Sequence, residues 1–145
     1  MKNMISQVKN CKVFVLCALF LVALMGCKNS DPFVDPGDTP NPNWVITVEN
    51  NMPSSLTAIV KVSFAKNEGV LAAFMGNDCC GIAEYKDGLY WLYVSPASET
   101  GGAVQLRFYS PDLKRIFEAT EIIPYSNNAM IGEVEDPYTP TWVVK

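Results

Sequence analysis

Apolar and polar residues alternate along most of the chain from residue 56 onward. The clearest run has apolar residues at every second position: Leu56, Ala58, Val60, Val62 and Phe64. Successive side chains of a strand point to opposite faces, so this run predicts a half-buried strand over residues 56–64, in which Ile59 breaks the alternation. Further short apolar runs predict strands at 70–75, 79–85, 89–95, 103–109 and 141–144, and either one strand or two strands that divide near Glu121 at 115–123.

Turn residues separate these runs. Asp87-Gly88 supplies the positive φ values that tight hairpins need, so Tyr85 and Leu89 are expected to flank an antiparallel turn. Residues 124–132 have no clear pattern, and no window of ten or more residues beyond the N-terminal region has convincing helical periodicity. Seven or eight short strands predict an all-β domain over residues 44–145, an antiparallel β-sandwich of immunoglobulin-like or jelly-roll-like type.

The N-terminal region has a continuous apolar run instead. Lys2, Lys9 and Lys12 precede apolar residues 13–25, and the run closes on Gly26-Cys27. A helix that crosses a bilayer needs about 20 apolar residues, so these 13 residues predict an export signal over 1–26 rather than a permanent span. Residues 27–43 contain four prolines and three aspartates, a composition typical of an extended, solvated tether.

The end of the apolar run, Leu24-Met25-Gly26-Cys27, resembles the lipobox of bacterial lipoproteins. That resemblance implies cleavage before Cys27 and acylation of its sulfur, which would anchor the protein to a membrane of the bacterial cell envelope. We expect the outer membrane, with the leaflet left open. The alternative is an ordinary secretory signal that happens to end in a cysteine.

Composition and charge exclude several functions. The chain has 11 basic and 15 acidic residues, and loss of the three lysines of the signal would change its net charge from −4 to −7. An acidic surface repels phosphate groups, and the chain has two arginines to bind them, so we exclude nucleic-acid binding. The absence of histidine excludes Ser-His-Asp and Cys-His nucleophiles and an imidazole zinc site. Carboxylate pairs can hydrolyse glycosides without histidine, but those here lie mostly at predicted turns and strand ends, so we expect neither enzymatic activity nor a cofactor.

Residues 71–83, Leu-Ala-Ala-Phe-Met-Gly-Asn-Asp-Cys-Cys-Gly-Ile-Ala, resemble a segment of a small β-sandwich module that recurs in secreted and surface proteins of Bacteroidetes-type bacteria. Residues 57–62, 106–111 and the closing turn at Ile131-Gly132 and Pro137-Tyr138 resemble other parts of it. The resemblance covers most of residues 44–138. It implies a β-sandwich at the cell surface and carries over no catalytic residue. This chain departs from the module at Cys80, where related sequences usually have arginine.

The aromatic run at 89–94 carries the candidate binding residues. If Tyr90, Leu92 and Val94 face the core, Trp91 and Tyr93 point the other way. We expect them to share an outer sheet face with Arg107 and Tyr109. Aromatic rings with polar neighbours stack on sugar rings and also anchor protein interfaces. The preferred function is therefore adhesion or glycan binding, and the alternative is a structural subunit that contacts other envelope proteins. A further alternative is that no binding face exists, either because other parts of the domain cover both faces of this strand or because Trp91 packs under the tether.

The remaining candidates are two thiols and two turn carboxylates. Cys79 and Cys80 lack the spacing of a zinc or redox motif. Side chains of adjacent strand residues point apart, so we expect one thiol in the core and the other half exposed. A strained vicinal disulfide and intermolecular pairing are the alternatives. Asp78 and Asp87 are weak candidates for Ca²⁺ binding, and we expect no other metal site.

Overall fold

The computed structural model describes residues 37–48, 55–96 and 102–145, and Gly37–Lys145 form one compact unit. Its described part has nine strands and no helix: β1 (Leu56–Val60), β2 (Val70–Met75), β3 (Asp78–Ile82), β4 (Glu84–Lys86), β5 (Leu89–Val94), β6 (Ala103–Ser110), β7 (Arg115–Pro124), β8 (Met130–Ile131) and β9 (Trp142–Val144). The predicted all-β class is confirmed. The count is nine rather than seven or eight because the hydrophobic pattern joins β4 to β3 and gives no signal for the two-residue strand β8.

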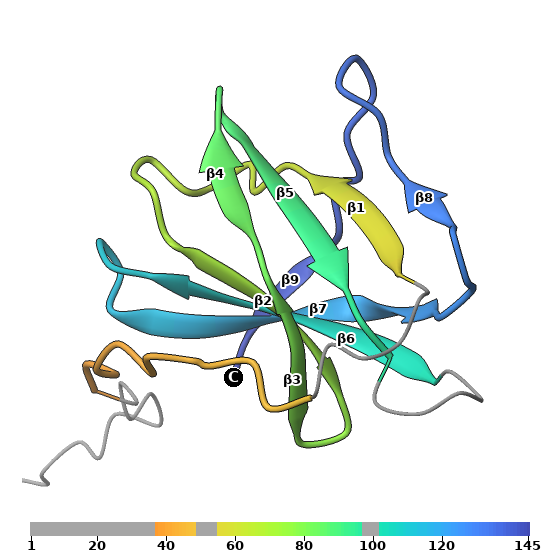
Figure 1. The fold of residues 1–145 in the computed structure, drawn as a ribbon. Helices are drawn as coiled ribbons and strands as arrows, with labels where there is room; N and C mark the ends of the chain where they lie inside the picture. Colours follow the sequence, from red (N-terminus) through yellow and green to blue (C-terminus); the bar gives the residue numbers. More distant parts are fainter. Residues whose placement is uncertain (1–36, 49–54, 97–101) are drawn as a thin grey trace, which may run out of the picture. The chain divides into compact units, whose positions relative to one another are not determined.

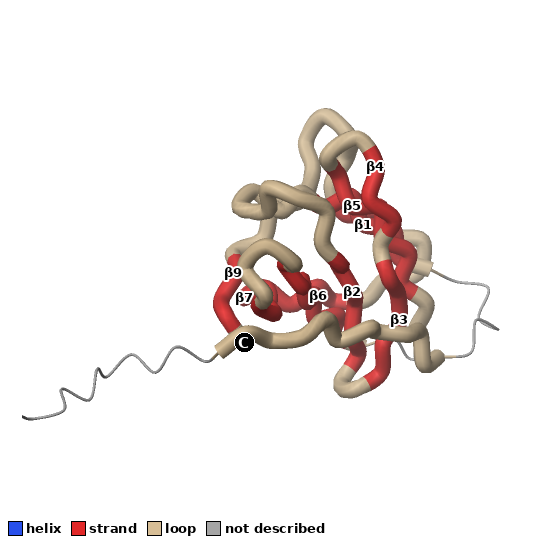
Figure 2. Tube along the Cα trace, turned by 90° about the vertical axis from the view of Figure 1, so that its left-hand side faces the viewer, coloured by secondary structure: helices blue, strands red, loops and turns tan. Residues whose placement is uncertain are grey.

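The strands form two facing sheets (Figure 1). One has four strands in the order β4-β5-β1-β8, and the other has five in the order β3-β2-β6-β7-β9. All neighbouring strands are antiparallel except β1 and β8, which pair in parallel. The view turned by 90° shows β1, β4 and β5 in one layer and β2, β3 and β6 in the other (Figure 2). This arrangement is the predicted β-sandwich.

Alternate residues of each central strand fill the space between the sheets. The side chains without solvent exposure include Leu56, Ala58 and Val60 of β1, Leu71 and Ala73 of β2, Leu92 and Val94 of β5, and Val104, Leu106 and Phe108 of β6. Burial of these side chains is the main stabilising contribution to the fold. Because the inward positions are so regular, the remaining positions on each strand must lie on the two outer faces, where any binding site would be found.

Some boundaries differ from the prediction. β1 ends at Val60, which is the last residue to pair with β5, and beyond it Lys61 N–H donates to the carbonyl of Tyr138. β7 runs without a break through Glu121. Its pairing with β6 is irregular in this region, where the register shifts between Gln105 and Arg107 of β6. The hairpin between β4 and β5 forms as predicted, with positive φ at Asp87 (53°) and Gly88 (82°).

The predicted strand at 79–85 is divided between the two sheets. β3 lies at the edge of the five-stranded sheet and β4 at the edge of the four-stranded sheet, with Ala83 between them. Figure 1 shows β3 continuing into β4 at this corner. The sheets meet closely here, because Ser95 N–H donates to Cys80 O (2.9 Å) and the Cα of Gly81 faces the backbone of Tyr93. Only glycine fits that approach, because a Cβ at position 81 would overlap the Tyr93 carbonyl.

Residues 37–48, which we call the strap, lie on the outer face of the five-stranded sheet. Thr39 N–H donates to Lys114 O (2.7 Å) near one end of the strap, and Thr47 N–H donates to Cys79 O (3.0 Å) near the other. Between them Trp44 packs on a small cluster formed by Ala72, Phe74, Cys79 and Ile82. The domain thus begins before residue 44, and the last part of the predicted tether belongs to it.

Candidate functional site

Trp91 and Tyr93 lie on the outer face of the four-stranded sheet, as their alternation with Tyr90, Leu92 and Val94 predicts. The three alternating partners are buried in the core, whereas Tyr93 is 60% exposed and Trp91 is partly exposed. Residues two apart on a strand project from the same face, about 7 Å apart along the chain. The two rings therefore offer neighbouring aromatic surfaces on one side of the protein.

Strand pairing identifies the neighbours of these rings. Trp91 lies between Ile59 of β1 and Glu84 of β4, and Tyr93 lies beside Thr57 of β1. Thr57 in turn pairs with Met130 of β8, whose side chain is 64% exposed. We call this surface the β5 face, and it consists of Thr57, Ile59, Glu84, Trp91, Tyr93 and Met130. It combines apolar area with one carboxylate, on Glu84, and two hydroxyl groups, on Thr57 and Tyr93.

Ile59 explains why the alternation of β1 is imperfect. Its side chain belongs to the β5 face, yet it is only 4% exposed. Trp91 stands directly opposite it in the strand register, and the segment around Tyr138 runs along the backbone of β1 on its other side. Ile59 is thus a buried apolar base of this face, opposite Trp91 in the strand register.

Arg107 and Tyr109 do not join the β5 face, so the expected grouping of four residues is wrong. Both belong to β6 in the five-stranded sheet, and they project from that sheet's outer face, opposite Ala72 and Val70. The alternation on each strand is as expected, but the chain passes from one sheet to the other between β5 and β6. Trp91 and Tyr93 therefore lie on one side of the sandwich, and Arg107 and Tyr109 lie on the other.

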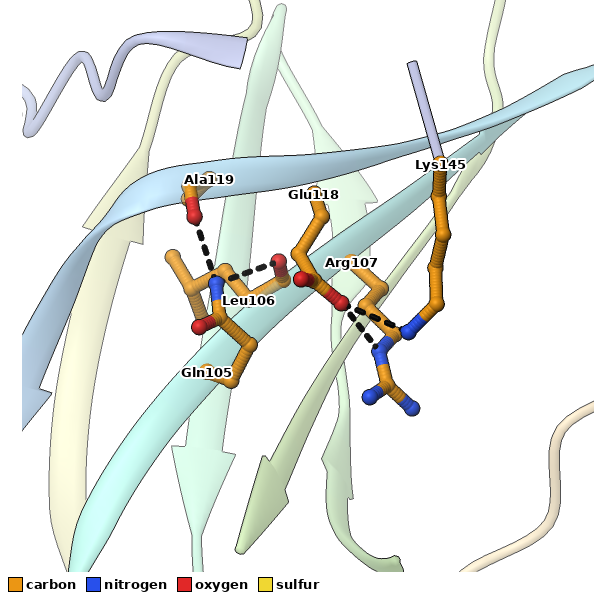
Figure 3. A network of polar contacts seen from close by, with 6 residues as sticks. All are labelled: Gln105, Leu106, Arg107, Glu118, Ala119 and Lys145. Carbon is orange, nitrogen blue, oxygen red and sulfur yellow. Dashed lines mark hydrogen bonds and ion pairs between the residues drawn. The ribbon is translucent and has the colours of Figure 1, made fainter. Parts of the chain in front are cut away.

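Arg107 takes part in contacts within the protein. Its guanidinium carbon lies 4.2 Å from the centroid of the Phe74 ring, a cation-π contact. Its Nε bonds Glu118 Oε2 (2.9 Å), which also pairs with Lys145 Nζ (2.7 Å), as Figure 3 shows. These two cations hold the pKa of Glu118 below its usual value, the Lys145 hydrogen bond being the largest cause. We therefore assign Arg107 a role in the stability of β6 and β7.

The two adjacent cysteines are free thiols, and both are buried. Cys80 is part of the main core, and Cys79 lies under the strap in the cluster with Phe74. Their side chains point to opposite sides, as predicted, but the expectation that one is half exposed is wrong because the strap covers Cys79. Burial raises the pKa of both thiols and so disfavours the reactive thiolate.

The carboxylates considered for Ca²⁺ lie apart. Asp78 begins β3, where Thr47 Oγ1 donates to its Oδ1 (3.5 Å). Asp87 lies in the hairpin between β4 and β5, and Figure 1 shows this hairpin at the end of β4 that is far from β3. Within residues 37–48, 55–96 and 102–145, no three metal-ligating side chains come together. Asp78 and Asp87 thus do not form a common site.

The predicted signal and Cys27, the predicted site of lipidation, lie outside the described residues. In the part of the chain that the structure describes, no helix is long and apolar enough to cross a bilayer. Comparisons with protein-family models, with curated proteins and with solved structures found no match to this chain.

Sequence reasoning missed three features near these faces: the strap, the base formed by Ile59, and a pocket beside Tyr109. The pocket draws on residues from three segments that are separated in the chain. Trp44 was a usable signal for the strap, since a large aromatic residue in a proline-rich segment needs a surface to cover.

Proposed function

We propose that this protein is a non-catalytic module of the bacterial cell envelope, anchored through a lipid at Cys27, that binds glycans through the β5 face. The observation that carries the proposal is the placement of Trp91 and Tyr93 on one outer face, with Tyr93 60% exposed. Sugar rings have apolar faces that stack on aromatic rings and hydroxyl groups that need polar partners. Glu84 and Thr57 lie beside the rings and can serve as those partners.

Several properties of the chain support the anchored, non-catalytic part of the proposal. The apolar run and Gly26-Cys27 are typical of a lipoprotein signal, and a lipid at Cys27 would keep the domain next to its ligand. The sequence has no histidine, and the side chains of the β5 face include one carboxylate, whereas glycoside hydrolysis uses a pair. The proposal therefore assigns the face to binding, without chemical conversion of the glycan.

A glycan array followed by calorimetric titration of the full-length protein in detergent tests the proposal. Trp91→Ala should weaken binding at least about tenfold, since a stacked aromatic ring contributes about 1.4 kcal/mol or more. Ile122→Ala is the matched control, because Ile122 is 59% exposed but belongs to the five-stranded sheet. Absence of binding to every polysaccharide, or equal loss in both variants, would contradict the proposal.

A second candidate function is that of an assembly subunit that contacts another envelope protein through the same face. Met130 favours it, because its 64% exposed side chain extends the apolar surface from Tyr93 across β1 to β8. Methionine and aromatic residues are enriched in protein interfaces. Crosslinking in cells separates the two functions: an assembly subunit yields a stoichiometric protein partner that Met130→Asp removes, whereas a glycan-binding module does not.

A further inference from the structure

Three segments of the chain meet around a pocket on the outer face of the five-stranded sheet. Its volume is about 260 Å³. The strap contributes Asn41, the entry to β2 contributes Glu68, Gly69 and Val70, and the end of β6 with its turn contributes Tyr109 and Pro111. The pocket lies on the opposite side of the sandwich from the β5 face, so it forms a separate candidate site.

Polar contacts tie these three segments together around the pocket. Asn67 Nδ2 donates to Asp112 Oδ1 (2.7 Å), which joins the loop before β2 to the turn after β6. Lys114 Nζ pairs with Asp38 Oδ2 (2.7 Å), and Thr39 N–H donates to Lys114 O (2.7 Å), which join that turn to the strap. The walls are thus held in place before a ligand arrives, which lowers the entropy cost of binding.

The lining combines apolar surface with two polar groups. Val70, Tyr109 and Pro111 supply the apolar part, and Tyr109 is only 7% exposed, so its ring is fixed in the sheet face. Asn41 accepts a hydrogen bond from Asn43 N–H at its oxygen (3.0 Å), which leaves its amide NH₂ available to donate. Within the described residues, neither a hydrogen bond nor an ion pair holds the exposed Glu68 carboxylate.

We infer that this pocket binds one neutral pyranose unit, with the apolar face of the sugar against Tyr109, Val70 and Pro111 and its hydroxyl groups bonded to Glu68 and Asn41. Pockets for drug-sized ligands span about 300–1,000 Å³, so the smaller volume here suits a single ring. Hydroxyl groups both donate and accept, which matches one acceptor and one donor in the lining. Glu68 is the charged residue among those that line the pocket, and its carboxylate disfavours an anionic sugar.

Saturation-transfer NMR on the full-length protein in detergent tests this inference. The probes are glucose, galactose and N-acetylglucosamine at tens of millimolar, with glucuronate as the anionic comparison. We expect signals from at least one neutral sugar and weaker signals from glucuronate. Glu68→Ala should weaken the binding of the neutral sugar about tenfold or more, because it removes a charge-assisted hydrogen bond. Val70→Phe should abolish it by filling the pocket.

Two control variants separate this inference from the function proposed above. Glu84→Ala and Trp91→Ala alter the β5 face and remove any contribution that it makes to the signals, so the loss caused by Glu68→Ala should be at least as large in the Trp91→Ala protein as in the unsubstituted protein. If Trp91→Ala abolishes the signals and Glu68→Ala leaves them intact, the sugar binds at the β5 face and the pocket inference is overturned. Absence of signals from all neutral sugars also overturns the pocket inference. It does not overturn the proposed function, because the glycan array and titration measure polysaccharide binding to the β5 face separately.

Discussion

The ring of Trp44 stands nearly perpendicular to the ring of Phe74, with 5.5 Å between the ring centroids and an angle of 76° between the planes. Phe74 also carries the guanidinium of Arg107 against its ring, at 4.2 Å. The strap and β6 thus meet on one side chain of β2. Because Cys79 belongs to the same cluster, this contact also determines whether its thiol is accessible.

Replacement of Trp44 should loosen the strap. We expect Trp44→Ala to lower the free energy of unfolding by about 2 kcal/mol, because it removes an aromatic contact and uncovers Phe74. Thiol modification of Cys79 should become faster, since burial both blocks the thiol and raises its pKa. Urea unfolding and the kinetics of modification by a disulfide reagent measure the two effects.

The control for this prediction lies in the strap itself. Val45 is 68% exposed, so Val45→Ala should change neither quantity appreciably. A Cys79→Ala variant identifies which thiol reacts, because Cys80 remains in the core. Equal modification rates in the Trp44→Ala protein and the unsubstituted protein would show that the strap does not protect Cys79.

Tyr90 and Tyr93 lie on opposite faces of β5 and offer a matched pair. Gly69 N–H donates to the Tyr90 hydroxyl (3.0 Å), and Tyr90 is 2% exposed. Tyr90→Phe removes the acceptor and should lower the free energy of unfolding by about 1–2 kcal/mol, because a shielded backbone donor is left without a partner. Tyr93→Phe removes an exposed hydroxyl and should change it by less than about 0.5 kcal/mol. Chemical denaturation of both variants checks the difference, and equal effects would contradict it.

Substitution of Gly81 should disrupt the corner between the sheets. A Cβ at this position would overlap the carbonyl of Tyr93, which is backbone and cannot rotate away. We expect Gly81→Ala to cost about 3 kcal/mol or more in the free energy of unfolding. Gly102→Ala is the control, because a Cβ there would meet Met75 Sδ and Cγ at the ordinary contact distances of 3.6 and 3.9 Å. A thermal midpoint for Gly81→Ala equal to that of the control would contradict the close approach.

Glu118 predicts a small dependence of stability on acidic pH. Its pKa is lowered in the folded protein, first by the Lys145 hydrogen bond and then by Arg107, so the folded state favours the ionised form. The resulting stabilisation is complete above the unfolded-state pKa of glutamate and is lost as pH falls through the lower folded-state pKa. The side chain is 29% exposed, so solvent screening limits the contribution to less than about 1 kcal/mol.

The measurement for Glu118 is urea unfolding at neutral pH and across the acidic range. Glu118→Gln should lower the free energy of unfolding at neutral pH and reduce its decline on acidification. Glu84→Gln serves as the control, because Glu84 is an exposed carboxylate on the other sheet. Parallel pH profiles for the Glu118→Gln protein and the unsubstituted protein would contradict a role for these ion pairs.

A continuous apolar run was enough to predict the strand around Ala73, and alternation was enough to predict the strands around Leu92 and Leu106 and the direction in which their side chains point. It was also enough, with Asp87-Gly88, to predict the hairpin after β4. These features depend on residues close together in the sequence. Periodicity specifies the two faces of a strand but not the sheet to which the strand belongs, which is why Arg107 and Tyr109 were grouped with Trp91 and Tyr93.

The strap and the pocket could not be predicted for a related reason. Prolines near Asp38 indicate an extended segment, and that conformation is compatible both with a solvated tether and with a segment laid on a sheet. The outcome depends on Phe74 and Lys114, which lie far away in the chain. Likewise, Asn41, Glu68 and Tyr109 become neighbours only through the order of strands in the five-stranded sheet and the path of the strap.

The path of the strap makes the sandwich unequal on its two sides. The strap covers part of the outer face of the five-stranded sheet, so a partner that bound there would first have to displace the strap. On the smaller sheet no described strand or loop competes in this way for Tyr93 and Met130. A ligand too large for the pocket beside Tyr109 should therefore bind more readily around Tyr93 and Met130, and substitutions that release the strap should expose a second apolar surface on the five-stranded sheet.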